Sequence, residues 1–122
     1  MNDIIEQFAR IVGANHVVTD AADMAGYLSE PRDLYRGKAL CAVRPGSTAE
    51  VAAVLKLCHD NGLRVTPQGG NTGLVGGQTP MDDRDVLIST TRLDKVREID
   101  LASSTMTVEA GVTLLRVQEE AE

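Results

Sequence analysis

The 122-residue sequence contains very few aromatic residues, cysteines and histidines. Aromatic side chains make up 2% of it and there is no tryptophan, so we expect an aliphatic core of Val, Leu, Ile and Ala. The two cysteines, Cys41 and Cys58, lie in apolar surroundings without CxxC spacing. This predicts buried, reduced thiols, with a disulfide or a metal role as the alternative. His16 and His59 are too few and too isolated for a zinc site, so no metal ligands are predicted.

Long apolar runs and basic clusters are also missing. No apolar run approaches the ~18 residues of a membrane span, and no basic segment followed by an apolar run marks a signal peptide at the start. The net charge of −6 argues against nucleic acid or an anionic membrane as a partner. We therefore expect a cytoplasmic protein whose length fits one domain with a modest core.

The spacing of the apolar residues predicts helices that begin at recognisable capping residues. Asp3 is the expected cap of the first helix, Asp20 that of the second and Thr113 that of the last. Ser47, followed three residues later by Glu50, forms a capping box at the start of the third helix. The expected helices cover residues 3–12, 20–28, 47–60 and 113–117.

Short apolar runs bounded by proline and glycine predict the strands. Residues 39–43 and 63–66 flank the third helix, and this β-α-β unit implies a parallel pair joined by a right-handed crossover. Residues 86–88 form a third buried strand, and residues 95–100 and 105–109 form two strands around a turn. Half-buried alternation is expected in the last of these at Met106, Val108 and Ala110.

A charged connector, residues 29–38, joins the second helix to the first strand of this unit. Its charged side chains are expected to be solvated, with an arm that folds over a ligand as the alternative; they are Arg32, Asp33, Arg36 and Lys38. We therefore divide the chain into an N-terminal helical segment with its connector, residues 1–38, and the first part of a larger domain, residues 39–122.

The last helix has no recognisable stop signal. Residues 118–122 place three carboxylates at its C-terminal end, where the helix dipole disfavours anions, and no Gly, Asn or Lys closes it. We therefore expect this chain to be the N-terminal piece of a longer protein.

Residues 67–80, with the sequence PQGGNTGLVGGQTP, hold five glycines between two prolines. No Lys or Arg occurs between Arg64 and Arg84. Ordering so much glycine costs chain entropy, which an anionic ligand bound by bare backbone N–H groups offsets. The loop therefore predicts a cradle for phosphate or pyrophosphate. A P-loop is excluded because no lysine follows the last glycine, and a dinucleotide fingerprint because no two glycines are spaced i, i+2.

The same loop resembles the flavin diphosphate loop of the PCMH-type, vanillyl-alcohol-oxidase-like FAD-binding domain. Within that superfamily it is most similar to the branch of D-2-hydroxyglutarate dehydrogenase, D-lactate dehydrogenase and the glycolate oxidase subunit. Residues 43–51 resemble the family's first strand and helix, and residues 88–93 and 108–112 resemble its FAD-contacting strand ends. The resemblance implies an α+β fold: the N-terminal subdomain of the PCMH-type FAD-binding fold, a small partly parallel sheet with flanking helices.

The resemblance also implies that FAD is the ligand of the loop. The glycines would wrap the diphosphate through backbone amides, and the side chains of Asn71 and Thr72 would add hydrogen bonds. Covalent flavin relatives carry histidine at the position of Asn71, so non-covalent FAD is expected. Ser89, Ala110 and Gly111 would lie near the adenine, the ribose or the flavin ring. The expected cofactor-binding residues are Pro67, Gly69, Gly70, Asn71, Thr72, Gly73, Leu74, Gly76, Gly77, Gln78, Ser89, Ala110 and Gly111.

The family's activity is the oxidation of a D-2-hydroxy acid to a 2-oxo acid, with the hydride passed to the flavin. Its catalytic base, metal ligands and substrate pocket map beyond residue 122, so no catalytic residue is expected here and the chain alone is expected to be inactive. Two alternatives stay open. One is a non-catalytic module that binds another phosphate-bearing ligand or binds FAD weakly. The other is a piece whose unpaired strand edges associate with a second copy as a homo-oligomer.

Overall fold

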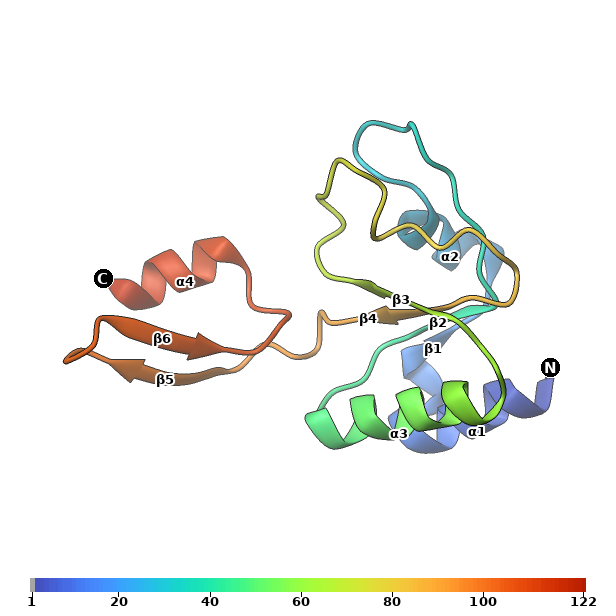
Figure 1. Ribbon diagram of the computed structural model, residues 1–122, viewed down its shortest axis with the longest axis horizontal. Helices are drawn as coiled ribbons and strands as arrows, with labels where there is room; N and C mark the ends of the chain where they lie inside the picture. Colours follow the sequence, from blue (N-terminus) through green and yellow to red (C-terminus); the bar gives the residue numbers. More distant parts are fainter. Residues whose placement is uncertain (1) are drawn as a thin grey trace.

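The computed structural model describes residues 2–122 and confirms the α+β fold (Figure 1). A four-stranded sheet with helices on both faces forms a core, and a hairpin with one helix projects from it. The helices are α1 (Asn2–Val12), α2 (Ala21–Leu28), α3 (Thr48–Asp60) and α4 (Leu114–Ala121), with a 3₁₀ turn, Ala14–His16, after α1. The strands are β1 (Val17–Val18), β2 (Cys41–Val43), β3 (Val65–Gln68), β4 (Val86–Ser89), β5 (Val96–Asp100) and β6 (Thr105–Val108).

The core sheet has the order β1-β2-β4-β3, in which β1 is antiparallel to β2 and the other neighbours are parallel. The β-α-β unit is present, but the expectation that its two strands pair directly is wrong, because β4 lies between β2 and β3. All four residues of β4 are buried, as suits a central parallel strand. β3 contains Pro67, which has no N–H to donate and is therefore suited to an edge.

The predicted position of β3 was also wrong, and the difference affects the glycine loop. The strand covers Val65–Gln68 instead of residues 63–66, and Gln68 pairs with Ser89 of β4. The glycine loop therefore begins directly at the carboxyl end of a parallel strand, with Gly69 as its first residue.

The sheet separates two apolar clusters, because alternate residues of β2 and β4 face opposite sides. On one face the fully buried Phe8 of α1 and Val54 of α3 pack against the sheet. On the other face Met24 of α2 packs against Ala42 and Leu87. Residues 1–38 and 39–122 thus contribute to the same core, and α1 and α3 cover one face of the sheet while α2 covers the other (Figure 1).

Three of the four predicted caps are confirmed. Asp20 accepts from two backbone N–H groups of α2, Ser47 accepts from Glu50 N at 3.1 Å, and Thr113 accepts from Arg116 N at 3.2 Å. The Asp3 cap is wrong, because α1 already includes Asn2 and Asp3 lies in the first turn. The capping box differs in one bond, since the Glu50 carboxylate accepts from the N–H of Gly46, at 2.9 Å.

Cys41 and Cys58 are free thiols buried in the core, as predicted. Burial raises the pKa of Cys41 to about 12, with a smaller effect from neighbouring Cys58, and burial raises the pKa of Cys58 to about 11. The reactive thiolate is therefore scarce at neutral pH. We expect a chromogenic disulfide reagent to label neither cysteine in the native protein at pH 7.5 and to label both in guanidinium chloride. Rapid labelling under native conditions would contradict this packing.

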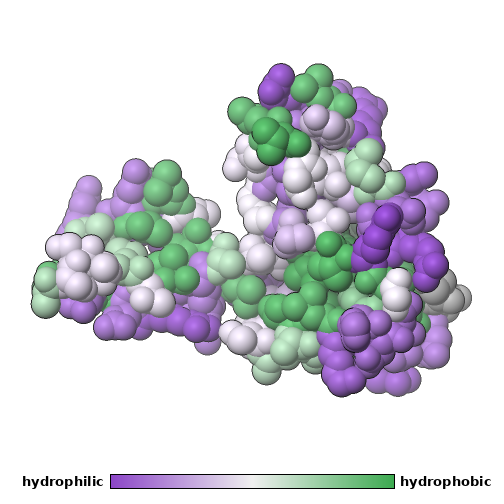
Figure 2. All heavy atoms as spheres, viewed as in Figure 1, coloured by the Kyte–Doolittle hydropathy of each residue, from purple (hydrophilic) through white to green (hydrophobic). Residues whose placement is uncertain are grey.

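The hairpin of β5 and β6 carries α4 on one side and forms the part that projects from the core (Figure 1). The alternation expected in β6 is wrong: Met106 is half-buried, but Val108 and Ala110 are exposed. The ribbon packs against α4, which leaves Ile99 and Met106 partly exposed, and it meets the core at the start of α3, where Arg97 Nη2 donates to Thr48 Oγ1 at 3.2 Å. Leu101, Leu114 and Leu115 are exposed as well, so apolar residues are visible on this part in Figure 2.

Two general features concern partners. Within residues 2–122 no helix is both long enough and apolar enough to cross a membrane. In the same residues no group of three or more His, Cys, Asp or Glu side chains is placed to hold a metal ion.

Candidate cofactor site

A cleft of about 400 Å³ lies between the core and the projecting part, at the carboxyl ends of β3 and β4. In open α/β sheets this end of parallel strands is where ligands bind. Figure 2 shows the surface hollowed between the two parts. The glycine loop forms one wall and the segment leading into α4 forms the other. The lining residues are Gly69, Gly70, Thr72, Thr91, Ala110, Gly111, Val112, Thr113 and Leu114.

Gly69 and Gly70 line the cleft, but the fold does not require glycine at either position. Neither has a left-handed φ. A Cβ built on Gly70 would meet nothing nearer than Thr72 Cγ2 at 4.0 Å, and one on Gly69 nothing nearer than Thr90 Oγ1 at 3.7 Å. The chain itself would therefore accept alanine at both positions. The absence of side chains leaves bare backbone beside the cleft, as an anion held by peptide N–H groups requires.

Gly111 lies in the opposite wall and is required for a different reason. A Cβ there would lie 1.9 Å from the carbonyl oxygen of Thr90 and 2.8 Å from that of Leu93. Gly111 N donates to Leu93 O at 2.7 Å, so the projecting part crosses the core backbone at this point. Glycine here allows the two walls to approach each other.

The side chain of Asn71 is directed toward the end of α2 and does not line the cleft. Its Nδ2 donates to Gly26 O at 3.1 Å and to Ser29 O, so both amide N–H groups are used at the C-terminal end of α2. Its Oδ1 is buried and has no partner in the part of the chain that the structure describes. The expected side-chain bond from Asn71 to the diphosphate is therefore wrong: an amide oxygen cannot donate to a phosphate. Asn71 instead fixes the loop, and its φ of 58° is one that Asn tolerates better than most residues.

Gln68 fixes the loop in the same way at its first residue. It is 3% exposed, and its Nε2 donates to Tyr27 O at 2.8 Å and to Gln78 O at 3.1 Å. Since the last carbonyl groups of a helix have no partner within the helix, the two amides satisfy acceptors that α2 would otherwise leave open. No local sequence signal indicates this role, because both acceptors are distant from Gln68 in the sequence.

The expected contact from Ser89 is not supported by its position. Ser89 is fully buried, and its Oγ lies 3.1 Å from Oγ1 of Thr91. Thr91 lines the cleft in its place. The next residue holds this segment on the core, since Arg92 Nη1 donates to Arg44 O at 2.7 Å. The sequence therefore predicted the right segment, residues 88–93, but the wrong residue within it.

The rest of the predicted loop residues lie outside this cleft. Gly76 has a φ of 80°, and a Cβ there would lie 3.0 Å from the ring of Tyr35. Gln78 Nε2 donates to Gly73 O at 2.8 Å and so closes the loop on itself. Contacts of these residues with a cofactor stay predictions, as do those of Pro67, Leu74 and Gly77.

The electrostatics of the cleft come from the backbone, because its lining side chains carry no charge. Thr113, the cap of α4, stands in the wall, so the N-terminal end of α4 faces the cleft. The first N–H groups of a helix and its dipole favour a negative charge. The glycine wall and this helix end together fit the diphosphate of FAD. No lining side chain titrates near neutral pH, so this cleft binds and does not supply acid–base catalysis.

Comparison with known proteins identifies the family and supports FAD as the cofactor. A family model described as "FAD binding domain" matches residues 39–122. The chain is 35% identical over 112 residues to the mitochondrial D-2-hydroxyglutarate dehydrogenase of Bos taurus, covering 92% of this chain and 20% of that protein. It is 38% identical over 119 residues to the quinone-dependent D-lactate dehydrogenase of Escherichia coli, covering 94% of this chain and 20% of that protein. The chain thus spans about a fifth of the length of the curated relatives it matches.

Solved structures show the same fold. Alkyldihydroxyacetonephosphate synthase superposes with a TM-score of 0.88 at 19% identity, over 98% of this chain and 24% of that one. p-Cresol methylhydroxylase superposes with a TM-score of 0.82 at 20% identity, again over 98% of this chain and 24% of that one. The family model matches more than half of the chain, at residues 39–122, and the chain therefore belongs to the FAD-binding domain family, with FAD as its cofactor.

Proposed function

We propose that this chain is the diphosphate-holding part of an FAD-dependent dehydrogenase that oxidises a D-2-hydroxy acid, of the D-2-hydroxyglutarate or D-lactate type, to the 2-oxo acid. The observation that carries the proposal is the pair Gly69 and Gly70, which line the cleft although the fold would accept a side chain at either position. The names of the bovine and bacterial relatives indicate the class of substrate.

In this proposal the backbone of Gly69 and Gly70 would hold FAD, which would supply a hydride acceptor for C2 of the substrate and a route for the electrons to a separate acceptor. The chain's own residues bind and orient. Gly69 and Gly70 line the cleft, where their backbone N–H groups would bind the diphosphate, and the side chains of Gln68 and Asn71 fix that backbone to α2. Because the groups are fixed before the cofactor arrives, little ordering entropy is lost on binding.

The proposal also includes non-covalent binding of FAD and contacts of the projecting part with other polypeptide. Asn71 has an amide where covalent relatives carry histidine, which supports non-covalent FAD. The exposed leucines of the projecting part support contacts with a second copy or with further polypeptide. Cytoplasmic placement and a glycolate oxidase activity stay predictions from the sequence, and the bovine relative is named a mitochondrial enzyme.

The test uses the native protein, purified at its full length. We expect a bound flavin with its visible absorption bands, and we expect acid precipitation to release that flavin into the supernatant. Under anaerobic conditions D-2-hydroxyglutarate or D-lactate should bleach the visible bands, because the reduced flavin absorbs much more weakly there. The measurement is the spectrum before and after each addition.

The matching L-hydroxy acid serves as the control and should leave the flavin oxidised. A flavin that stays with the precipitate would contradict non-covalent binding. If the protein binds another phosphate compound to saturation but does not bind FAD, it is better described as a phosphate-binding module.

A further inference from the structure

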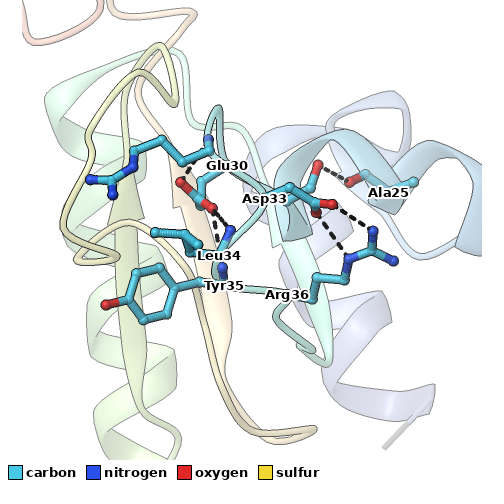
Figure 3. Close-up of polar contacts among 8 residues, drawn as sticks. Ala25, Glu30, Asp33, Leu34, Tyr35 and Arg36 are labelled. Atoms are coloured by element: carbon cyan, nitrogen blue, oxygen red, sulfur yellow. Dashed lines mark hydrogen bonds and ion pairs between the residues drawn. The ribbon is translucent and has the colours of Figure 1, made fainter.

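A buried carboxylate in the connector after α2 has no role in the function described above. Glu30 is 6% exposed, and the backbone turns around it (Figure 3). Its Oε2 accepts from Arg32 N at 3.0 Å, and its Oε1 accepts from Leu34 N and from Tyr35 N, the latter at 3.1 Å. The charged residues expected to be solvated are exposed, as predicted: Arg32, Asp33, Arg36 and Lys38. Glu30, to which the sequence assigned no role, is buried, and its partners are backbone groups.

The carboxylate stays charged in this environment. Desolvation acts to raise the pKa of Glu30, but the three backbone hydrogen bonds and the nearby charge of Arg32 outweigh it and lower the pKa below its usual value. A charged acceptor makes hydrogen bonds about twice as strong as a neutral one. Glu30 therefore fixes the conformation of residues 32–35, including the left-handed φ of 52° at Asp33.

The turn is part of a longer arm, residues 29–38, which returns to the helix it leaves. Ser29 and Arg36 form an antiparallel bridge, and Gly37 N donates to Leu28 O at 2.7 Å. On the exposed side Arg36 binds Asp33 through two hydrogen bonds of 2.8 and 3.0 Å. Figure 3 shows that this ion pair and Glu30 lie on different sides of the arm.

The arm contacts the glycine loop at its start, its middle and its end. At the start, Asn71 Nδ2 donates to Ser29 O. In the middle, the ring of Tyr35 covers Gly76, so closely that a Cβ on Gly76 would lie 3.0 Å from the ring. At the end, Lys38 N donates to Pro80 O at 3.0 Å. Figure 1 shows the arm and the loop side by side above the sheet. The position of the loop therefore depends on the shape of the arm.

We propose that Glu30 is a positioning residue for FAD: it holds the arm, the arm holds the glycine loop, and the loop presents Gly69 and Gly70 to the diphosphate. The inference rests on the proposal that the diphosphate lies at these two glycines. Glu30 itself does not line the cleft. Its effect is thus on the affinity for FAD, through preorganisation of the loop.

The test measures the dissociation constant of FAD for apoprotein prepared from the native, full-length protein, by flavin fluorescence titration. For Glu30→Ala we expect the dissociation constant to rise about tenfold, because the loop must be ordered during binding. For Glu30→Gln we expect a smaller rise. The carbonyl oxygen of the glutamine can still accept from Leu34 N and Tyr35 N. Its NH₂ group would face the N–H of Arg32, so two donors would meet and that hydrogen bond would be lost. Asp33→Asn is the matched control, since it alters an exposed charge on the same arm and should leave the affinity within about twofold.

A second readout separates positioning from a purely structural role. In the wild type, FAD should slow hydrogen exchange in peptides that cover residues 30–38, although the arm does not line the cleft. In Glu30→Ala this FAD-dependent protection should be lost. The double variant of Glu30→Ala with Asn71→Ala should bind FAD more tightly than the sum of the two single effects predicts, because both changes release the same loop.

The outcomes distinguish this inference from the function it rests on. If Gly70→Val loses FAD but Glu30→Ala binds FAD as the wild type does, with only a lower melting temperature, Glu30 is a structural residue and the inference is overturned. If Gly70→Val keeps wild-type affinity, or the wild-type apoprotein does not bind FAD, the proposed site at Gly69 and Gly70 fails and the inference fails with it.

Discussion

A Gly70→Val variant is expected to fold normally and to lose FAD. A Cβ at this position has free space in the chain, the nearest atom being Thr72 Cγ2 at 4.0 Å, and the backbone has no left-handed φ. The branched side chain would instead occupy the cleft where the diphosphate meets the backbone. We expect the dissociation constant of FAD to rise more than about 100-fold, which corresponds to about 2.7 kcal/mol. Flavin titration of the full-length apoprotein gives the affinity, and circular dichroism gives the melting temperature.

Two further variants calibrate this result. Gly70→Ala adds a single methyl group and should give an intermediate loss of affinity. Gly26→Ala is the matched control: this glycine lies in α2, is exposed, and a Cβ there meets nothing within 4 Å. Since alanine favours a helix over glycine, Gly26→Ala should keep wild-type affinity and gain slightly in stability. A Gly70→Val protein that stays fully yellow would remove Gly70 from the site.

A Gly111→Ala variant is expected to lose FAD for the opposite reason, through loss of structure. Its Cβ would lie 1.9 Å from Thr90 O and 2.8 Å from Leu93 O, and backbone atoms cannot move aside as a flexible side chain can. The crossing between the core and the projecting part must open, which should cost about 3 kcal/mol. Hydrogen exchange should become fast in peptides from β6 and α4, while those from β2 and β4 keep their protection. FAD affinity falls with it, because one wall of the cleft is displaced.

The two variants together test the assignment of the two glycines. Gly70→Val should lower affinity with an unchanged melting temperature and unchanged exchange in the apoprotein. Gly111→Ala should change all three. An apoprotein of Gly111→Ala with wild-type exchange in β6 and α4 would show that the crossing relaxes without cost, and the structural role of Gly111 would then be wrong.

Much of the fold was predictable because the signals are local. Asp20, Ser47 and Thr113 begin helices through bonds to N–H groups two or three residues away, so a short window contains the whole interaction. The apolar run of β4 and the turn between β5 and β6 are equally local. The sequence also indicated the glycine loop, because five glycines without nearby cations point to backbone recognition of an anion.

The order of the strands needed the tertiary structure. A β-α-β pattern predicts two parallel strands but contains no information about a later strand inserted between them, and β4 takes that place. The same holds for exposure in β6: alternation predicts a half-buried face, but burial depends on what covers it. Val108 lies beside the start of α3 without being covered by it and is 36% exposed.

By itself, the sequence indicated FAD as the cofactor and predicted the glycine loop as its binding site, because the pattern of glycines and of the segments around it is specific. Only the tertiary structure decided which glycine does what. Gly70 faces an open cleft, Gly76 fits under Tyr35 and Gly111 fits between two carbonyl groups. It also turned Asn71 from an expected phosphate ligand into an anchor on α2, and showed that the backbone of the arm turns around the carboxylate of Glu30. The physical reason is the same throughout: each role depends on a neighbour distant in sequence, whose position is set by packing of the whole chain.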